Sequence, residues 1–134
     1  MSERAFVMIK PDGVRRGLIG EIVSRFEKKG LSVVKAELIQ VSEATAKEHY
    51  GHLEAKPFFR ELVDYITSGP SFAMIVEGTA AVKNSRYLIG ATNPADAAPG
   101  TIRGDYGLDV SENVIHGSDS IDNARIEIER FFIR

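Results

Sequence analysis

Residues 4–30 read RAFVMIKPDGVRRGLIGEIVSRFEKKG and contain a strand, a turn and a helix in succession. The apolar run between Arg4 and Lys10 predicts a short buried strand. Pro11-Asp12-Gly13 is typical of a turn. Apolar residues then recur at helical spacing up to Lys29, and Gly30 follows as a C-terminal stop. The stretch therefore predicts a buried strand followed by an amphipathic helix.

The same alternation continues along the chain. We expect further strands at 31–40, 71–77 and 114–115, and helices at 42–50, 57–66, 82–89 and from Ser120 onward. This order resembles a β-α-β-β-α-β unit with extra helices. The predicted fold class is α+β, ferredoxin-like, with a four-stranded antiparallel sheet covered by helices on one face. Residues 1–134 form a single domain in this reading.

One region lacks periodicity. Residues 90–113 hold four Gly, two Pro and five Asp or Asn in 24 positions. Long irregular segments in small domains are uncommon and are usually functional.

Composition excludes several classes of protein. The 134 residues carry a formal net charge of −2, which provides no excess of positive charge for binding a polyanion. The chain has no cysteine, which excludes disulfides, thiolate nucleophiles and zinc fingers. No signal peptide is recognisable, and no apolar run approaches the roughly 20 residues that span a bilayer. We expect a soluble cytoplasmic protein.

The three histidines are the first candidates for chemistry, because the sequence has no P-loop, dinucleotide fingerprint or protein-kinase motif. His49 and His52 have the spacing of metal ligands, but no third ligand accompanies them, and we expect both at the surface. His116 stands at the end of a predicted strand, before a glycine and three small polar residues. A side chain at such a strand end can be both fixed and accessible.

Three cations occur in or beside irregular segments: Lys10, Arg86 and Arg103. Phosphoryl transfer needs cations that offset the charge of the phosphate oxygens, together with a positioned nucleophile. A neutral imidazole is a competent nucleophile, and the unperturbed pKa of histidine, about 6.5, leaves most of it neutral at pH 7. Glu127, inside the last predicted helix, is a candidate to fix the His116 tautomer.

Lys10, Arg103 and His116 lie within longer motifs, and through these motifs the whole chain resembles the nucleoside diphosphate kinase family. The motifs are IKPDGV at 9–14, RGLIGEI at 16–22, EHY at 48–50, KPFF at 56–59, SGP at 68–70, GATNPAD at 90–96, PGTIRGD at 99–105 and NVIHGSDS at 113–120. Position 91 departs from the family pattern, since it is alanine where many relatives have a larger or charged residue.

The resemblance implies a ping-pong enzyme that maintains nucleotide pools. In it, His116 takes the γ-phosphate of a nucleoside triphosphate, mainly ATP, and passes it to a nucleoside diphosphate. Glu127 would orient His116, and Ser118 and Tyr50 would support that pair. The phosphates would contact Lys10, Arg86, Thr92 and Arg103, and the ribose hydroxyls would contact Asn113 and Lys10. The base would stack on Phe58, helped by Leu62 and Val110, although the i, i+4 spacing of Phe58 and Leu62 alone favours ordinary core packing.

The resemblance also implies a cofactor and an assembly. Mg²⁺ would arrive on the nucleotide phosphates, since the sequence offers no carboxylate cluster to hold it, and no protein metal site is predicted. The loop that contains Pro94 resembles the one around the three-fold axis of hexameric members, so we expect a hexamer built from dimers rather than a tetramer. The chain ends soon after its last predicted helix, where longer members have an extension that contributes to subunit contacts.

Three other functions stay open. A nucleic-acid-binding module would need a basic, aromatic sheet face, which RAFVMIK and SFAMIVE do not provide. A phosphohistidine carrier would use His116 but would have no use for the nucleotide site formed by Phe58, Arg86, Thr92 and Asn113 together. A catalytically silent scaffold would not need the matched residue types at every site position.

Overall fold

Strand β1 (Ser2–Ile9) runs through the interior of a four-stranded antiparallel sheet, in the computed structural model that describes residues 2–133. The strand order is β2-β3-β1-β4, with β2 at Ser32–Ile39, β3 at Ser71–Thr79 and β4 at Ile115–Gly117. β1 pairs with β3 along its whole length and with β4 at its C-terminal end, where Met8 lies opposite His116. The four expected strands and the antiparallel α+β fold are confirmed, but the last strand begins at Ile115 rather than Val114 and includes His116.

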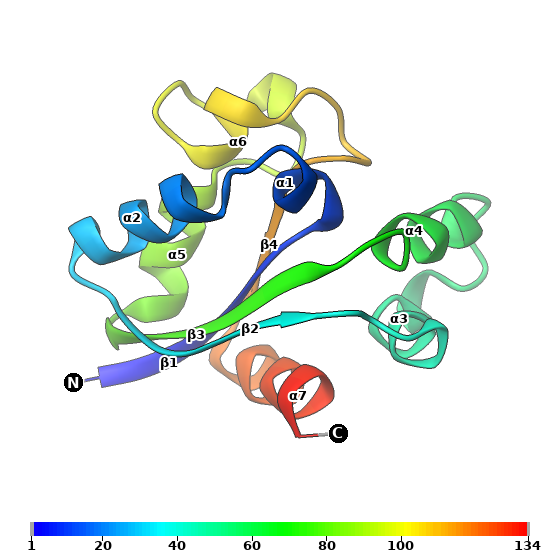
Figure 1. The fold of residues 1–134 in the computed structure, drawn as a ribbon, viewed down its shortest axis with the longest axis horizontal. Coiled ribbons are helices and arrows are strands. Elements are labelled where there is room, and N and C mark those ends of the chain that lie inside the picture. Colours follow the sequence, from blue (N-terminus) through cyan, green and yellow to red (C-terminus); the bar gives the residue numbers. More distant parts are fainter. Residues whose placement is uncertain (1, 134) are drawn as a thin grey trace.

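Helices cover both faces of this sheet (Figure 1). Ala5, Val7 and Ile9 of β1 belong to one core cluster, whereas Phe6 and Met8 belong to the other, and all five are fully buried. The expectation of a single covered face was therefore wrong. An unbroken apolar strand has no polar side to expose, because successive side chains point to opposite faces.

Each face has its own set of helices. On the face of Val7 lie α2 (Ile19–Lys29) and α5 (Ala81–Ile89). On the face of Phe6 lie α3 (Glu43–His49), α4 (Phe59–Ile66) and α7 (Ile121–Phe132). Ser42 and Ser120 cap α3 and α7 by accepting hydrogen bonds from backbone N–H groups, as the sequence indicated. A short 3₁₀ turn, η1 (Gly51–Leu53), connects α3 toward α4.

Three local expectations need correction. The Pro11-Asp12-Gly13 turn is the start of a short helix, α1 (Pro11–Arg15). The irregular region contains a 3₁₀ turn, η2 (Pro94–Asp96), and a helix, α6 (Ile102–Tyr106), which the hydroxyl of Thr101 caps. Helix α4 begins at Phe59 rather than at Pro57. Short helices of this kind are set by caps and tertiary contacts rather than by periodicity, so a periodic pattern misses them. No helix within residues 2–133 is both long and apolar enough to cross a bilayer.

Candidate active site

His116 is held at the centre of β4 by a carboxylate from the last helix. Its Nε2 lies 2.9 Å from Oε1 of Glu127, on α7, and the hydroxyl of Ser118 donates to the same oxygen at 2.7 Å. Both Glu127 and Ser118 are buried. Since Glu127 accepts from Nε2, the arrangement fixes the ring and leaves Nδ1 as the nitrogen available for bond formation.

The imidazole faces a hollow of about 610 Å³ between α3, α5 and α7. Its lining includes Tyr50, Arg86, His116 and Glu127, which the sequence predicted as site residues. Arg86 donates from Nη1 to the carbonyl of Gly117 at 3.2 Å, so its charge stands next to His116 along the strand. Burial raises the pKa of Tyr50 to about 12, which keeps its hydroxyl protonated as a donor.

A second predicted group lies where β1 ends against the segment before β4. Nζ of Lys10 donates to Oδ1 of Asn113 at 3.0 Å, and Nδ2 of Asn113 donates to the carbonyl of Thr92 at 3.0 Å. Arg103 donates from Nη2 to the carbonyl of Ile115 at 2.6 Å. The structure thus brings together Lys10, Thr92, Arg103 and Asn113, which come from separate parts of the chain. They lie at the segment that precedes His116.

The two cations of this group, Lys10 and Arg103, are buried close to each other. Lys10 is 9% exposed and Arg103 is 4% exposed. Burial, followed by repulsion from Arg103, lowers the pKa of Lys10 to about 8. Burial, followed by repulsion from Arg86, lowers the pKa of Arg103 to about 10. A site that holds desolvated cations together in this way favours a multiply charged anion.

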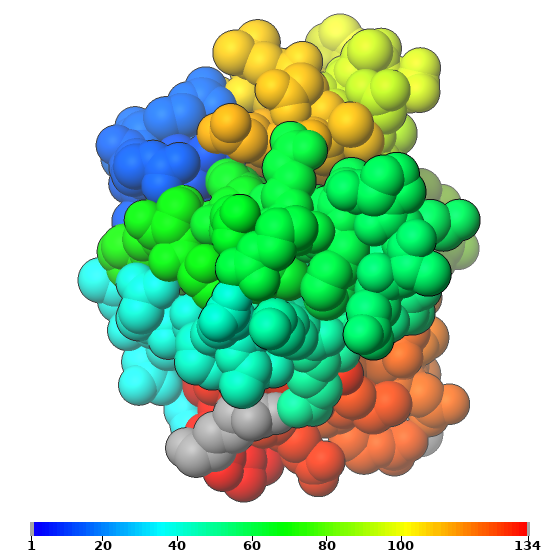
Figure 2. Space-filling view, turned by 90° about the vertical axis from the view of Figure 1, so that its right-hand side faces the viewer, coloured from blue at the N-terminus to red at the C-terminus, as the bar shows by residue number. Residues whose placement is uncertain are grey.

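Two of the three predicted base-binding residues are exposed. Phe58 is 45% exposed and Val110 is 55% exposed, and neither belongs to a core cluster. The alternative of ordinary core packing is therefore wrong for Phe58, whereas Leu62 does pack against the core. These three residues do not line the His116 hollow. Figure 2 views the molecule from the side on which α3, in turquoise, and α4, in green, face the reader, with the segment near residue 110, in orange, above them.

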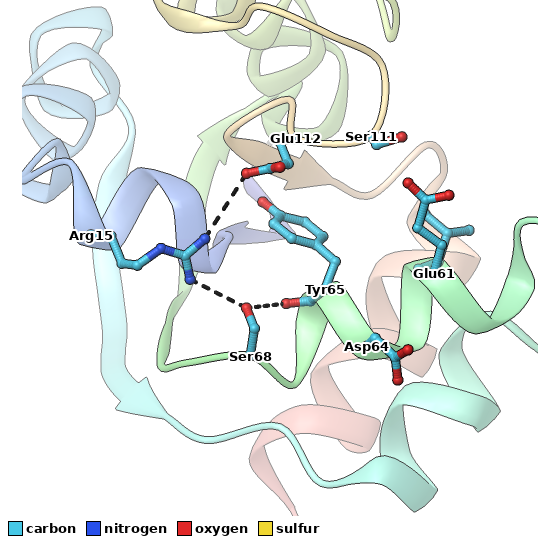
Figure 3. Close-up of a pocket in the computed structure, with 8 residues that line it drawn as sticks. Arg15, Glu61, Asp64, Tyr65, Ser68, Ser111 and Glu112 are labelled. Carbon is cyan, nitrogen blue, oxygen red and sulfur yellow. Dashed lines mark hydrogen bonds and ion pairs between the residues drawn. The ribbon is translucent and has the colours of Figure 1, made fainter.

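Leu62 instead lines a second cavity, of about 570 Å³, between α4 and the segment 111–112 (Figure 3). Arg15 bridges this cavity, since its guanidinium lies 4.0 Å from Glu112 and donates to the hydroxyl of Ser68 at 3.2 Å. Tyr65, next to them on α4, was not singled out in the sequence.

His49 is not the surface residue that the sequence suggested. Its ring lies edge-on to that of His116, with 5.0 Å between the centroids, and its Nδ1 lies 2.9 Å from Nη1 of Arg130. Burial first, then the nearby positive groups, lower its pKa to about 2, so the ring is neutral. His52 is exposed, as expected. The EHY motif includes His49, but the spacing of His49 and His52 alone could not distinguish a buried histidine from one at the surface.

Within residues 2–133, one set of His and acidic side chains has the spacing of a metal site: His49, His116 and Glu127, whose ligand atoms lie within 4.8 Å of one another. Two of its members are already paired in the His116–Glu127 bond. The set is rich in nitrogen, which Mg²⁺ does not prefer.

One nitrogen of His116 is fixed by a carboxylate, and several desolvated cations lie nearby. Such a site is suited to phosphoryl transfer in which the protein itself carries the phosphate. The comparisons with known proteins agree. A sequence model of the family described as Nucleoside diphosphate kinase matches residues 3–134. Nucleoside diphosphate kinase 1 of Nicotiana tabacum is 59% identical over 130 residues, covering 97% of this chain and 88% of that protein. The enzyme of Archaeoglobus fulgidus is 58% identical over 130 residues, covering 97% and 86%.

Solved structures show the same fold. The nucleoside diphosphate kinase of Halobacterium salinarum in complex with CDP superposes with a TM-score of 0.96 at 55% identity, covering 100% of this chain and 90% of that one. The enzyme of Encephalitozoon cuniculi gives a TM-score of 0.95 at 46% identity, covering 97% and 88%. The chain belongs to the nucleoside diphosphate kinase family, and it is a nucleotide-binding phosphotransferase.

Proposed function

We propose that His116 is the phosphate carrier of a ping-pong reaction. In the first half, Nδ1 attacks the γ-phosphorus of a nucleoside triphosphate, the bond from phosphorus to the β–γ bridging oxygen breaks, and the diphosphate leaves with that oxygen. In the second half, a terminal oxygen of another diphosphate attacks the same phosphorus and Nδ1 departs. The observation that carries this assignment is the 2.9 Å bond between Nε2 and Glu127, which frees Nδ1.

Glu127 does more than orient the ring. When Nδ1 bonds to phosphorus while Nε2 keeps its proton, positive charge develops on the imidazole. The buried carboxylate, held in place by Ser118, lies against that charge and stabilises it.

The surrounding cations receive the phosphates. Arg86 bonds to the carbonyl of Gly117, just after His116, and Arg103 bonds to that of Ile115, just before it. Lys10 bonds to Asn113, a little earlier in the same segment, so three cations lie along the backbone around His116. We assign Thr92 to the phosphates, Asn113 together with Lys10 to the ribose hydroxyls, and Tyr50 to the support of His116. The exposed Phe58 and Val110 leave faces free for a base, with Leu62 beside Phe58, and an aromatic face accepts any base.

Magnesium enters this scheme with the nucleotide. The carboxylates that line the hollow have protein partners: Glu127 accepts from His116 and Ser118, Asp119 accepts from Asn123 at 2.6 Å, and Glu48 accepts from Arg130 at 3.2 Å. Mg²⁺ bridging the phosphate oxygens would offset their charge during transfer.

The sheet edge supports the proposal of self-association. Within residues 2–133, β2 pairs on one side only, with β3, and Val34 and Leu38 are exposed along it. An open apolar edge favours pairing with a second copy. We propose dimers that pair at β2 and assemble further into a hexamer rather than a tetramer, through the loop around Pro94. Native mass spectrometry measures the copy number directly. The cytoplasmic location stays a prediction.

Intact-mass spectrometry tests the reaction. The protein is mixed with Mg·ATP alone, desalted at alkaline pH, and then mixed with CDP. We expect one added phosphate, its loss when CDP is added, and the appearance of CTP. His116→Ala should take no phosphate and should still bind Mg·ADP. A phosphate that persists after CDP addition would favour the carrier alternative, and phosphate uptake by His116→Ala would refute the assignment of the nucleophile.

A further inference from the structure

The peptide segment immediately before His116 is strained. Val114 has a φ of 76°, which β-branched residues rarely adopt. The N–H of Ile115 donates to the carbonyl of Asn113 at 2.9 Å, which closes a three-residue γ-turn around Val114. With a positive φ at its centre, this is the rare, strained form of the γ-turn. The turn lies between the ribose-binding candidate Asn113 and the nucleophile.

The junction of β1 and α1 holds this turn closed. The backbone N–H of Lys10 donates to the carbonyl of Val114 at 2.8 Å, and Oδ2 of Asp12 accepts from the N–H of Val114 at 3.1 Å. Both backbone polar groups of Val114 are therefore bonded to one short segment about a hundred positions away in the sequence. Asp12 is 5% exposed, so its carboxylate is shielded from competing water.

The other oxygen of the same carboxylate connects to α4. The hydroxyl of Tyr65 donates to Oδ1 of Asp12, and burial together with that carboxylate raises the pKa of Tyr65. Figure 3 shows the Tyr65 ring rising from α4 beside Glu112, while its backbone carbonyl accepts from Ser68. Tyr65 is three positions after Leu62, on the helix that follows Phe58.

We propose that Tyr65 and Asp12 are positioning residues, which act through the Val114 turn to set where His116 and Asn113 stand relative to the base-binding end of α4. The inference rests on the proposed function, since it assigns a role to residues that connect two parts of that site. Its physical basis is continuity: one buried carboxylate bonds to the strained turn with one oxygen and to α4 with the other.

The consequence concerns the chemical step rather than binding alone. In-line transfer requires Nδ1 to meet the γ-phosphorus at a defined distance from the ribose and base contacts, and a misplacement of about 1 Å costs up to a hundredfold in rate. Without the tyrosine hydroxyl, the carboxylate can turn away from the N–H of Val114, and the turn can relax. Nucleotide would still bind, but with His116 less well aligned.

The test compares Tyr65→Phe, Asp12→Asn and the double variant with wild type. The measurements are the rate constant for phosphorylation of His116 at saturating Mg·ATP, by quenched-flow intact mass, and the Kd for Mg·ADP. We expect Tyr65→Phe to lower the rate constant about tenfold while Kd changes less than twofold. The double variant should lose no more than the worse single one, because both changes break the same link. Tyr87→Phe is the matched control, since Tyr87 is exposed and lies on α5, away from the turn.

A second readout separates this role from a general loss of stability. The ¹⁵N and ¹H shifts of the His116 ring and of the Val114 amide report the geometry of the folded state. We expect both to move in Tyr65→Phe and to stay fixed in Tyr87→Phe. Unchanged rate constants and unchanged shifts in Tyr65→Phe would overturn the link. If wild type itself took no phosphate, the proposed function would fail, while the ring and amide shifts would still decide whether Tyr65 sets the turn.

Discussion

The depressed pKa of Lys10 predicts how nucleotide binding changes with pH. Burial and the neighbouring Arg103 lower the pKa of this lysine to about 8, although Asp12 partly opposes them. In the free protein, Lys10 is then roughly 90% charged at pH 7 and roughly 10% charged at pH 9. Bound phosphates bring negative charge against the ammonium and raise its pKa again, so binding above pH 8 takes up a proton.

The size of the effect follows from these fractions. If nucleotide binds only the protonated form, the Kd of Mg·ADP rises about tenfold between pH 7 and pH 9. The phosphates themselves stay ionised in this range, because their second pKa is about 6. Isothermal titration calorimetry in two buffers with different heats of ionisation measures both the Kd and the proton uptake. His116→Ala serves as the background, so that no phosphate is transferred during the titration.

Lys10→Arg is the control, since a guanidinium keeps its charge throughout this window. Its Kd should stay nearly flat from pH 7 to pH 9. A wild-type Kd that does not change, or an equal rise in Lys10→Arg, would refute the reasoning. The lowered pKa of Lys10 also affects stability. Between pH 8 and about 10.5, the unfolded chain binds a proton at Lys10 that the folded chain does not. The contribution of this residue to the free energy of unfolding therefore becomes more favourable to the folded state as pH rises through that window.

Four further substitutions test other parts of the structure. Glu127→Gln should lower the phosphorylation rate constant about 10- to 100-fold with Kd unchanged, because it removes the negative charge that stabilises the developing imidazolium; quenched-flow mass spectrometry measures this. Phe58→Ala should weaken ADP, GDP, CDP and UDP alike by about 1–3 kcal/mol, and a loss confined to one base in calorimetry would contradict stacking. Gly13→Ala should destabilise the fold by about 1–3 kcal/mol in urea unfolding, because the added Cβ would lie 2.7 Å from a side-chain atom of β1. Gly20→Ala, on α2 with no atom within 4 Å of the added Cβ, should instead be neutral or stabilising.

The sequence predicted the elements that a local pattern encodes. The apolar strands, the Gly30 stop and the Ser42 and Ser120 caps are each specified within a few residues, and the structure confirms them. From the sequence we did not predict that both sheet faces are covered, although the unbroken apolar run of β1 has no polar face. Helix α6 was missed because five residues contain too little of a helical period to be recognised.

The candidate site likewise contains residues that the sequence identified and one that it did not. His116, Arg86 and Glu127 could be proposed from the sequence because their side chains have recognisable chemistry, and His116 also belongs to a motif. His49 could not be placed correctly, since its burial comes from the packing of α3 against α7 and not from its neighbours in the chain. Its neutral ring beside His116 is a tertiary property.

Val114 marks the limit of sequence reasoning most clearly. A valine at the start of a predicted strand indicates extended backbone, yet here it has a φ of 76°. The conformation is imposed by bonds to Lys10 and Asp12, residues that a local pattern assigns to a different strand and turn. Strain of this kind costs of the order of 1–3 kcal/mol and persists only where the surroundings fix it. Because the surroundings here are one buried carboxylate and one backbone N–H, we expect the position of His116, the proposed nucleophile, to depend on the β1–α1 junction as much as on β4.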